Sequence, residues 1–321
     1  MAIIAITQKC NSKCTFCKIW ECKNPIDFDE NLIDKLPVSL KEVNLTGGEP
    51  FLHAKIEIIV GKLSALGCKV VINTNGLVKI KSSSRVLEFK NVGIRFSLDG
   101  IGEAHDALRG VPGNFQTVMK QIDNLRTWNF KDLGIFSTFS DANWRELVPL
   151  YELSRSLGVG FSCAVAVNSE TFYKTSANGF KNAGPFIGEL RKIISRELRS
   201  LRLKNIGKAL FLHELARFAA GEIKVLSCLA GSSFFFMAPS GDLSACNMRD
   251  LPMGNLAEGA FEDLWFSSVS QNARSLTARC DKPCWTMCNA KRILKDNVLN
   301  YCVKFLQPLE TPYEADNLVR S

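Results

Sequence analysis

Three cysteines near the start of the chain constrain its structure more than any other feature. Cys10, Cys14 and Cys17 follow a CxxxCxxC spacing, and the apolar run at residues 3–6 is typical of a strand that leads into this loop. Three thiolates at this spacing can hold three irons of a cubane cluster and leave the fourth iron open to a substrate or cofactor. A closed zinc site is the alternative, but it needs four ligands, and the eight residues of the motif hold no fourth Cys or His.

The composition excludes several classes of protein. The 321 residues are 46% hydrophobic, which is typical of a globular chain with one large and one smaller domain. No apolar run approaches the ~20 residues that span a membrane, and the start lacks a secretory signal pattern. Twelve cysteines without such a signal predict metal ligation in a reducing compartment, and therefore a cytoplasmic location.

The net charge of +8 is concentrated in residues 191–208. Apolar residues form a single stripe within this stretch, so we favour a solvated helix face. A dock for an acidic electron donor, an anionic substrate or an anionic membrane is the alternative. We expect no nucleic-acid partner, because no supporting motif accompanies the charge.

Strand-like runs alternate with helical patterns over the first half of the chain. The predicted strands are residues 2–7, 42–46, 69–73, 93–98, 133–138 and 160–167. Six such alternations predict a parallel α/β sheet. The cysteine loop and the loops at 47–50, 73–76 and 97–100 all follow predicted strands, which is where barrel enzymes build their sites.

These ordered motifs resemble the radical S-adenosylmethionine (radical SAM) superfamily. CNSKCTFC is similar to its cluster loop, GGEP follows at 47–50, and SLDG follows at 97–100. The run HDALRG at 105–110 and the later Gly113 and Phe115 are similar to members with an auxiliary cluster domain. The resemblance implies a partial (β/α)6 TIM-like barrel over residues 1–166 with a C-terminal SPASM/twitch domain.

A second set of cysteines lies between residues 225 and 302: Cys228, Cys246, Cys280, Cys284, Cys288 and Cys302. A hairpin predicted over 234–246 brings the first two near one another. The pattern resembles a SPASM/twitch domain, which holds auxiliary iron–sulfur clusters. Residues 167–224 are predicted to form a helical bridge, and residues 303–321 an irregular tail.

The number of cysteines in this second set limits the number of auxiliary clusters. A full SPASM domain supplies seven cysteines for two clusters, and a twitch domain supplies about four for one. With six available, we predict one auxiliary [4Fe–4S] cluster, held by Cys228, Cys246 and two of Cys280, Cys284 and Cys288. Two clusters, or a structural zinc in CxxxCxxxC, are the alternatives.

The resemblance also implies roles for single residues in cofactor binding. Cys10, Cys14 and Cys17 would hold the first [4Fe–4S] cluster. The residues implied in binding S-adenosylmethionine are Phe16 near the adenine; Gly47, Gly48 and Glu49 at the amino group; Ser97 and Asp99 at the ribose; and Arg109 at the carboxylate. A surface turn is the alternative for Arg109. Residues 133–138 lack the Gly-x-Ile-x-Gly pattern that some members carry.

The implied activity is reductive cleavage of S-adenosylmethionine to a 5′-deoxyadenosyl radical, which abstracts hydrogen from a substrate C–H bond. An auxiliary cluster can accept the electron left on the substrate. We therefore expect a net oxidative modification, by dehydrogenation or bond formation, of a small molecule, a lipid or sugar intermediate, or a peptide. The expected reductant is a flavodoxin or ferredoxin. Because only nine residues precede Cys10, we expect no fused peptide-recognition domain.

Two alternatives to this activity remain open. A redox-neutral epimerase or radical-addition enzyme would leave the auxiliary cluster passive, and Cys163 on the last barrel strand is then the candidate hydrogen donor. A non-catalytic iron–sulfur electron-transfer protein is the alternative from another class. Three cysteines without an assigned role are predicted to be buried small apolar residues: Cys22, Cys68 and Cys302. The same is predicted for Cys163 if it is not the hydrogen donor.

Overall fold

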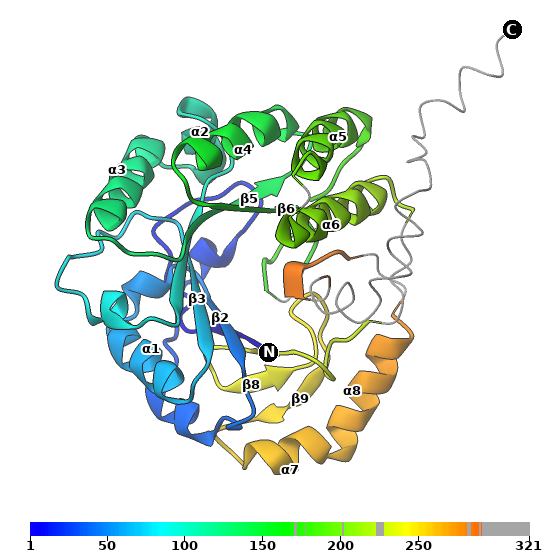
Figure 1. The fold of residues 1–321 in the computed structure, drawn as a ribbon. Coiled ribbons are helices and arrows are strands. Elements are labelled where there is room, and N and C mark those ends of the chain that lie inside the picture. The colour runs from blue at the N-terminus through cyan, green and yellow to red at the C-terminus, as the bar shows by residue number, and fades with distance from the viewer. Residues whose placement is uncertain are drawn as a thin grey trace, which may run out of the picture.

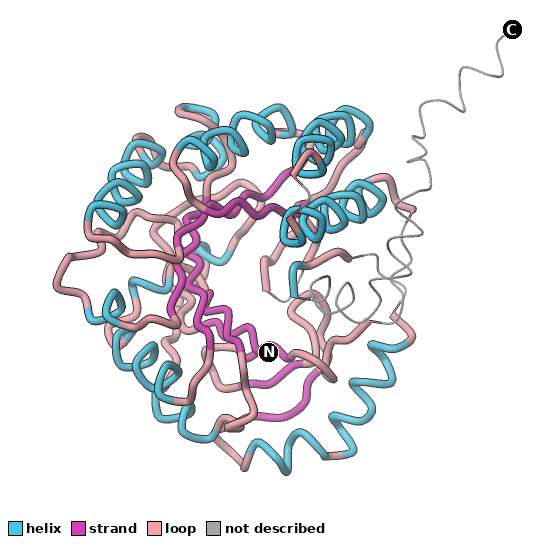
Figure 2. Tube along the Cα trace, viewed as in Figure 1, coloured by secondary structure: helices cyan, strands magenta, loops and turns pink. Residues whose placement is uncertain are grey.

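The computed structural model describes residues 1–169, 172–176, 178–200, 202–222, 228–280, 284–288 and 290. Cys302 and the predicted tail at 303–321 lie outside these residues. Across the described residues, one sheet has the strand order β6-β5-β4-β3-β2-β1-β7-β8-β9. Figures 1 and 2 show this sheet curved around a central space, with helices along its outer side.

The first six strands are parallel neighbours and alternate with helices, as the sequence predicts. They are β1 (Ala2–Ala5), β2 (Glu42–Thr46), β3 (Lys69–Thr74), β4 (Val92–Ser97), β5 (Leu133–Phe139) and β6 (Gly160–Val165). The helices are α1 (Ile56–Ala65), α2 (Glu103–Arg109), α3 (Asn114–Thr127), α4 (Leu147–Ser156), α5 (Gly184–Leu198) and α6 (Leu203–Ala219). Short 3-10 helices cover Ile19–Glu21, Glu30–Lys35, Pro50–Leu52, Arg85–Glu88 and Trp144–Glu146. This arrangement confirms the partial TIM-like barrel.

The C-terminal part continues the same sheet. Its elements are β7 (Phe235–Met237), β8 (Asp242–Ser244), β9 (Pro252–Asn255), α7 (Phe261–Phe266) and α8 (Ser268–Ala278). β7 pairs in parallel with β1, and Ala2 lies opposite Phe235. β7 and β8 form the predicted antiparallel hairpin, whose turn uses Gly241 at φ +86°. The hairpin therefore lies directly beside the strand that leads into the first cysteine loop (Figure 1).

Alternation along the strands separates the outer core from the lumen. On β2, Val43 and Leu45 pack outward with α1, while Asn44 points the other way. β1 behaves similarly, since Ile4 joins the outer core and Ile3 joins a separate inner cluster with Phe236. The barrel thus leaves a partly polar inner face for a site.

Helices α5 and α6 extend the outer layer of the barrel. Their apolar residues share one core with β4, β5 and β6. The helical bridge at 167–224 stays a prediction, and the helices described in it pack on the sheet rather than between two separate bodies. Among the described helices, none is long and apolar enough to cross a membrane.

Candidate active site

The first cysteine loop is anchored to the end of α2. Its backbone N–H groups at Lys13 and Thr15 donate to the carbonyls of Arg109 and Leu108, both at 2.9 Å. Helix α2 is capped by Gly110, whose φ is +64° and where a Cβ atom would lie 2.6 Å from the Lys13 carbonyl oxygen. Only a glycine allows the loop and the helix end to approach so closely.

The glycine loop after β2 lies against the residues that lead into the cysteine motif. Gly48 N–H donates to the Thr7 carbonyl and Glu49 N–H donates to the Lys9 carbonyl, both at 2.8 Å. A Cβ atom at Gly47 would lie 2.3 Å from the Thr7 carbonyl oxygen, and one at Gly48 would lie 2.1 Å from that of Lys9. The N–H groups of Gly48 and Glu49 are therefore already paired within the protein. The glycines hold the two loops together.

The Glu49 carboxylate is fully buried. It accepts hydrogen bonds from Phe51 N–H at 3.0 Å, the Thr74 hydroxyl at 2.8 Å and Asn75 N–H at 2.6 Å. Burial raises its pKa to about 7, although these hydrogen bonds favour the charged form. The side chain thus ties the ends of β2 and β3 together. An amino-group contact by the side chain, as the resemblance implies, would have to share oxygens that already have partners.

The structure brings the three cysteines of the first motif together in a buried setting. Burial raises the pKa of Cys10 to about 12 and that of Cys17 to about 11, and the neighbouring thiols of the motif add to both shifts. Such thiols hold their protons unless a strong positive charge replaces them. An iron–sulfur cluster supplies that charge, so the donor set fits the cluster that the spacing predicts.

Polar groups also contact the sulfurs of this motif. The Ser12 hydroxyl lies 3.3 Å from Cys14 Sγ, and Arg109 Nη1 lies 3.7 Å from the same sulfur. The Asn75 side-chain amide donates to Cys10 Sγ at 3.9 Å. Sequence reasoning did not select Ser12 or Asn75. The only signal was that Asn75 lies in a loop at the carboxyl end of a predicted strand.

Arg109 and Asp99 form a buried ion pair. Arg109 Nε donates to Asp99 Oδ2 at 2.6 Å, and both residues are buried. Arg109 is therefore not a surface arginine, and its guanidinium is already engaged by Asp99 and Cys14. Asp99 is likewise engaged at Oδ1, which accepts from Thr138 N–H at 2.7 Å. Ser97 ends β4 and is half-buried, and Phe16 lies under the Arg109 guanidinium at 5.3 Å.

Four cysteines of the second set interact electrostatically with one another. The pKa of Cys284 rises to about 12 through burial and the neighbouring Cys228, Cys246 and Cys280. Cys246 Sγ accepts a hydrogen bond from Met248 N–H at 3.2 Å. In the described part of the chain, no three Cys, His, Asp or Glu side chains are placed to hold a single metal ion.

Cys288 lies close to this group but faces the barrel. It is buried, and Asn44 Nδ2 on β2 lies 3.7 Å from its sulfur. It shares the inner apolar cluster with Ile3 and Phe236, and Cys228 and Cys246 pack against that cluster. The structure thus brings together five of the six predicted auxiliary cysteines, and Cys302 lies outside the described residues.

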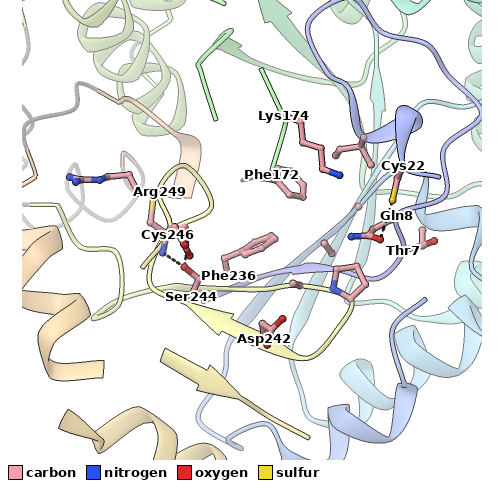
Figure 3. A pocket seen from close by; sticks show the side chains of 16 residues that line it. Thr7, Gln8, Cys22, Phe172, Lys174, Phe236, Asp242, Ser244, Cys246 and Arg249 are labelled. Atoms are coloured by element: carbon pink, nitrogen blue, oxygen red, sulfur yellow. Dashed lines mark hydrogen bonds between the residues drawn. The ribbon is translucent and has the colours of Figure 1, made fainter. Parts of the chain in front are cut away.

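A cavity of about 200 Å³ lies between the barrel and the hairpin of β7 and β8 (Figure 3). Gly47 and Gln8 border it on the barrel side, and Cys246 borders it on the hairpin side. Phe172 and Phe236 pack edge to face within its wall, with ring centroids 5.1 Å apart. One cavity therefore touches both the glycine loop and the second cysteine set.

Cys22 differs from its predicted setting, whereas Cys163 is buried as a small core residue. Cys22 lines the cavity, and its thiol donates to Gln8 Oε1 at 3.5 Å, so it is not a buried apolar residue. Cys163 is 0% exposed and packs with Phe161 and Val165 in the core beneath α5 and α6. A hydrogen donor must face the substrate, and Cys163 faces away from the lumen. Burial raises the pKa of its thiol to about 12.

The fold and this site define an iron–sulfur protein built on a partial barrel, with a second cysteine-rich domain beside its active face. Residues 4–153 match the radical SAM superfamily, and residues 228–289 match the SPASM iron–sulfur cluster-binding domain. The chain belongs to the radical SAM superfamily of enzymes and carries a C-terminal SPASM domain. Its cofactors include a [4Fe–4S] cluster and S-adenosylmethionine, and the SPASM domain binds auxiliary iron–sulfur.

Curated relatives act in different pathways. The chain is 25% identical over 285 residues to the sporulation killing factor maturation protein SkfB of Bacillus subtilis, covering 87% of this chain and 66% of SkfB. It is 23% identical over 294 residues to the AdoMet-dependent heme synthase of Oleidesulfovibrio alaskensis, covering 82% of this chain and 73% of that protein. The chain thus spans slightly less than two thirds of SkfB.

Solved structures share the fold. The structure of anSMEcpe with bound AdoMet and Cp18Cys peptide has a TM-score of 0.67 at 14% identity, covering 94% of this chain and 97% of that one. Streptococcus suis SuiB bound to S-adenosylmethionine has a TM-score of 0.61 at 17% identity, covering 86% of this chain and 68% of that one. At these identities the likeness concerns the fold alone.

Proposed function

We propose that this chain modifies a substrate C–H bond by radical SAM chemistry, with a net oxidation that uses one auxiliary cluster. Cys10, Cys14 and Cys17 would hold the [4Fe–4S] cluster that binds S-adenosylmethionine. When bound, the cluster and S-adenosylmethionine supply a 5′-deoxyadenosyl radical for hydrogen abstraction. The observation that carries the proposal is the single cavity that borders both the glycine loop and Cys246.

The chain's own residues bind, orient and exclude water at this cavity. Gly47 and Gly48 allow the glycine loop to lie directly against the residues that lead into the cysteine loop, because a Cβ atom at either position would meet the Thr7 or Lys9 carbonyl. Phe172 and Phe236 provide an apolar wall, so a reactive intermediate is shielded from bulk water. A substrate in the cavity would lie beside the glycine loop and Cys246 of the second cysteine set, which supports electron transfer to an auxiliary cluster after hydrogen abstraction.

For the auxiliary cluster we propose Cys228, Cys246, Cys280 and Cys284 as the ligands. The electrostatic influence of these thiols on one another supports this set. Cys228, Cys246 and Cys280 each raise the pKa of Cys284, and Cys280 also raises the pKa of Cys228 and of Cys246. Cys288 contacts Asn44 inside the barrel and is not one of the proposed ligands of this cluster. Two auxiliary clusters would require Cys288 and Cys302 as further ligands.

For the substrate we propose a peptide, with a small tetrapyrrole as the second candidate. Relatives and structural neighbours are named for peptide maturation or peptide complexes, and other relatives are heme synthases. A cavity of about 200 Å³ is small compared with the ~300–1,000 Å³ of drug-sized sites, which supports one amino-acid side chain over a macrocycle.

The test begins with the anaerobically reconstituted protein, S-adenosylmethionine and dithionite. We expect 5′-deoxyadenosine, together with ~8 irons and matching sulfide from two clusters of four. A triple Cys10→Ala, Cys14→Ala, Cys17→Ala variant should keep about half of the iron and form no 5′-deoxyadenosine. Iron without any 5′-deoxyadenosine in the wild type would instead indicate an electron-transfer protein. Zinc without sulfide would exclude both the radical SAM enzyme and the electron-transfer protein.

Single variants test the proposed auxiliary ligands. Cys280→Ala and Cys284→Ala should each lose about half of the iron, because a four-thiolate cluster rarely survives the loss of a ligand. Cys288→Ala should keep it. Cys68→Ala is the control, since Cys68 is a buried cysteine that lies in the outer core near α1. If Cys288→Ala loses iron and Cys280→Ala does not, the proposed ligand set is wrong, and Cys288 takes the place of Cys280 in it.

One observation favours the redox-neutral alternative. The Cys22 thiol lines the cavity, so it could return a hydrogen atom to a substrate radical, and the thiyl radical would then take one electron and one proton through the reductant. Turnover in D2O separates the two functions. If the enzyme is an epimerase, the wild-type product should contain one deuterium, and the Cys22→Ala variant should not form this deuterated product. If the reaction is an oxidation, the product should lack two hydrogens, and the Cys22→Ala variant should form the same product.

A further inference from the structure

One buried arginine links the end of the barrel sheet to the first cysteine loop. Arg109 is 8% exposed and has three different partners. Its Nε donates to Asp99 Oδ2 at 2.6 Å, its Nη1 lies 3.7 Å from Cys14 Sγ, and its Cζ lies 5.3 Å from the centre of the Phe16 ring. The guanidinium therefore places one edge on a carboxylate and the other on a sulfur.

The guanidinium keeps its charge in this setting. A guanidinium stays protonated in proteins, and the Asp99 carboxylate 2.6 Å from its Nε favours the charged form. Asp99 is fixed in turn, since its other oxygen accepts from Thr138 N–H on β5. The result is a rigid pair of opposite charges with the positive member against the cysteine.

We propose that Arg109 sets the reduction potential of the cluster held by Cys14, and that Asp99 on its far side limits this effect. The proposal rests on the proposed function only in taking Cys14 as a cluster ligand. One electron from a low-potential donor adds one negative charge beside Arg109, and no bond or proton is exchanged with the side chain. A cation that donates to the ligand sulfur stabilises the reduced form and so raises the potential.

A purely mechanical role makes a different prediction. If Arg109 only tied the loops together, removing either member of the pair would loosen the site in the same way. With a role in tuning the potential, the two changes act in opposite directions. Arg109→Gln removes the positive charge and lowers the potential, while Asp99→Asn removes the opposing negative charge and raises it.

The experiment is an EPR-monitored reductive titration of the reconstituted full chain. The signal that is missing from the triple Cys10→Ala, Cys14→Ala, Cys17→Ala variant reports the N-terminal cluster. We expect Arg109→Gln to make its one-electron reduction at least tenfold less favourable, a shift of ~59 mV to lower potential. Asp99→Asn should shift it upward, and Arg109→Lys, which keeps the charge, should shift it less than Arg109→Gln.

Arg95 provides the matched control. It is also an inner-face arginine of the barrel, 18% exposed in its side chain, and its Nη2 donates to Asp132 Oδ1 at 2.5 Å, with no cysteine among its hydrogen-bond partners. Arg95→Gln should leave the potential unchanged. Circular dichroism and iron content of each variant establish that the folded, loaded protein is compared.

Three outcomes would overturn the proposal. The first is a shift of the same sign in Arg109→Gln and Asp99→Asn, and the second is unchanged potentials in both. The third is loss of the cluster from both Arg109→Lys and Arg109→Gln, which would make Arg109 an assembly residue. If no signal in the wild type responds to S-adenosylmethionine, the proposed function fails, while opposite shifts of the N-terminal signal would still support the tuning of a cluster at Cys14.

Discussion

Replacing Gly48 with alanine tests whether the contact between the glycine loop and the cysteine loop is as tight as the structure indicates. The added Cβ atom would lie 2.1 Å from the Lys9 carbonyl oxygen and 2.9 Å from Cys10 Cβ. The oxygen belongs to the backbone, so no side-chain rotation relieves the contact. The two loops must separate by about 1 Å to reach an ordinary separation.

The cost follows from two effects. Overpacking of this kind costs about 1–3 kcal/mol. The separation also weakens the hydrogen bond from Glu49 N–H to the Lys9 carbonyl, which is 2.8 Å long and contributes about 1 kcal/mol. Gly48→Ala should therefore lower the free energy of unfolding by about 2–4 kcal/mol. Because Cys10 moves with Lys9, the variant should also retain less iron after reconstitution.

Chemical unfolding of the cluster-free protein, followed by circular dichroism, measures the first effect, and iron analysis measures the second. Gly207→Ala is the control, because Gly207 lies within α6 and a Cβ atom there meets nothing within 4 Å. That change should raise the free energy of unfolding by about 0.5–1 kcal/mol. An unfolding midpoint for Gly48→Ala equal to that of the wild type would refute the reasoning, as it would mean that the loops are not in contact.

Three further predictions follow from buried and paired groups. Cys163→Ala should lower the free energy of unfolding by about 1 kcal/mol, since it leaves a small void in a sealed core, and should leave 5′-deoxyadenosine formation unchanged; loss of that activity would restore Cys163 as a candidate. Burial alone would raise the pKa of Asp132, but its pairing with Arg95 lowers it. Its stabilisation is thus present at neutral pH and lost as the pH falls through the lowered value, so Asp132→Asn should unfold more easily at pH 7 and match the wild type in strong acid. Lys208→Met should lower the free energy of unfolding by about 2 kcal/mol. The change removes the cation that lies 2.9 Å from Glu197, whose side chain is only 5% exposed. A change below the error of the denaturant titration would contradict this prediction.

Local sequence patterns were sufficient for the strands and for the face of the barrel on which the site lies. The predicted strands at 42–46 and 69–73 agree with β2 and β3 to within one residue, and the strand predicted at 160–167 ends two residues earlier, at Val165. Such patterns work because apolar alternation and β-branched content are properties of neighbouring residues. The same alternation could have oriented Cys163, since it shares its face of the strand with Phe161 and Val165.

Contacts between distant residues were not accessible in this way. The sequence predicted the hairpin near residue 241, but the pairing of β7 with β1 joins segments more than 230 residues apart, as Ala2 and Phe235 show. Likewise, the partners of Glu49 were not accessible. Its carboxylate accepts hydrogen bonds from Thr74 at the end of β3 and from Asn75 directly after it, and nothing in GGEP specifies those partners.

By itself, the sequence determined the kind of chemistry. The spacing of Cys10, Cys14 and Cys17 is a local constraint, and metal coordination depends first on which ligands lie within reach of one another along a short loop. Only the tertiary structure decided which charges surround those ligands. Arg109 meets Asp99 and Cys14 because a helix end, a strand end and a loop converge at the rim of the barrel, and the low polarity of that buried place fixes which partner each charge must take.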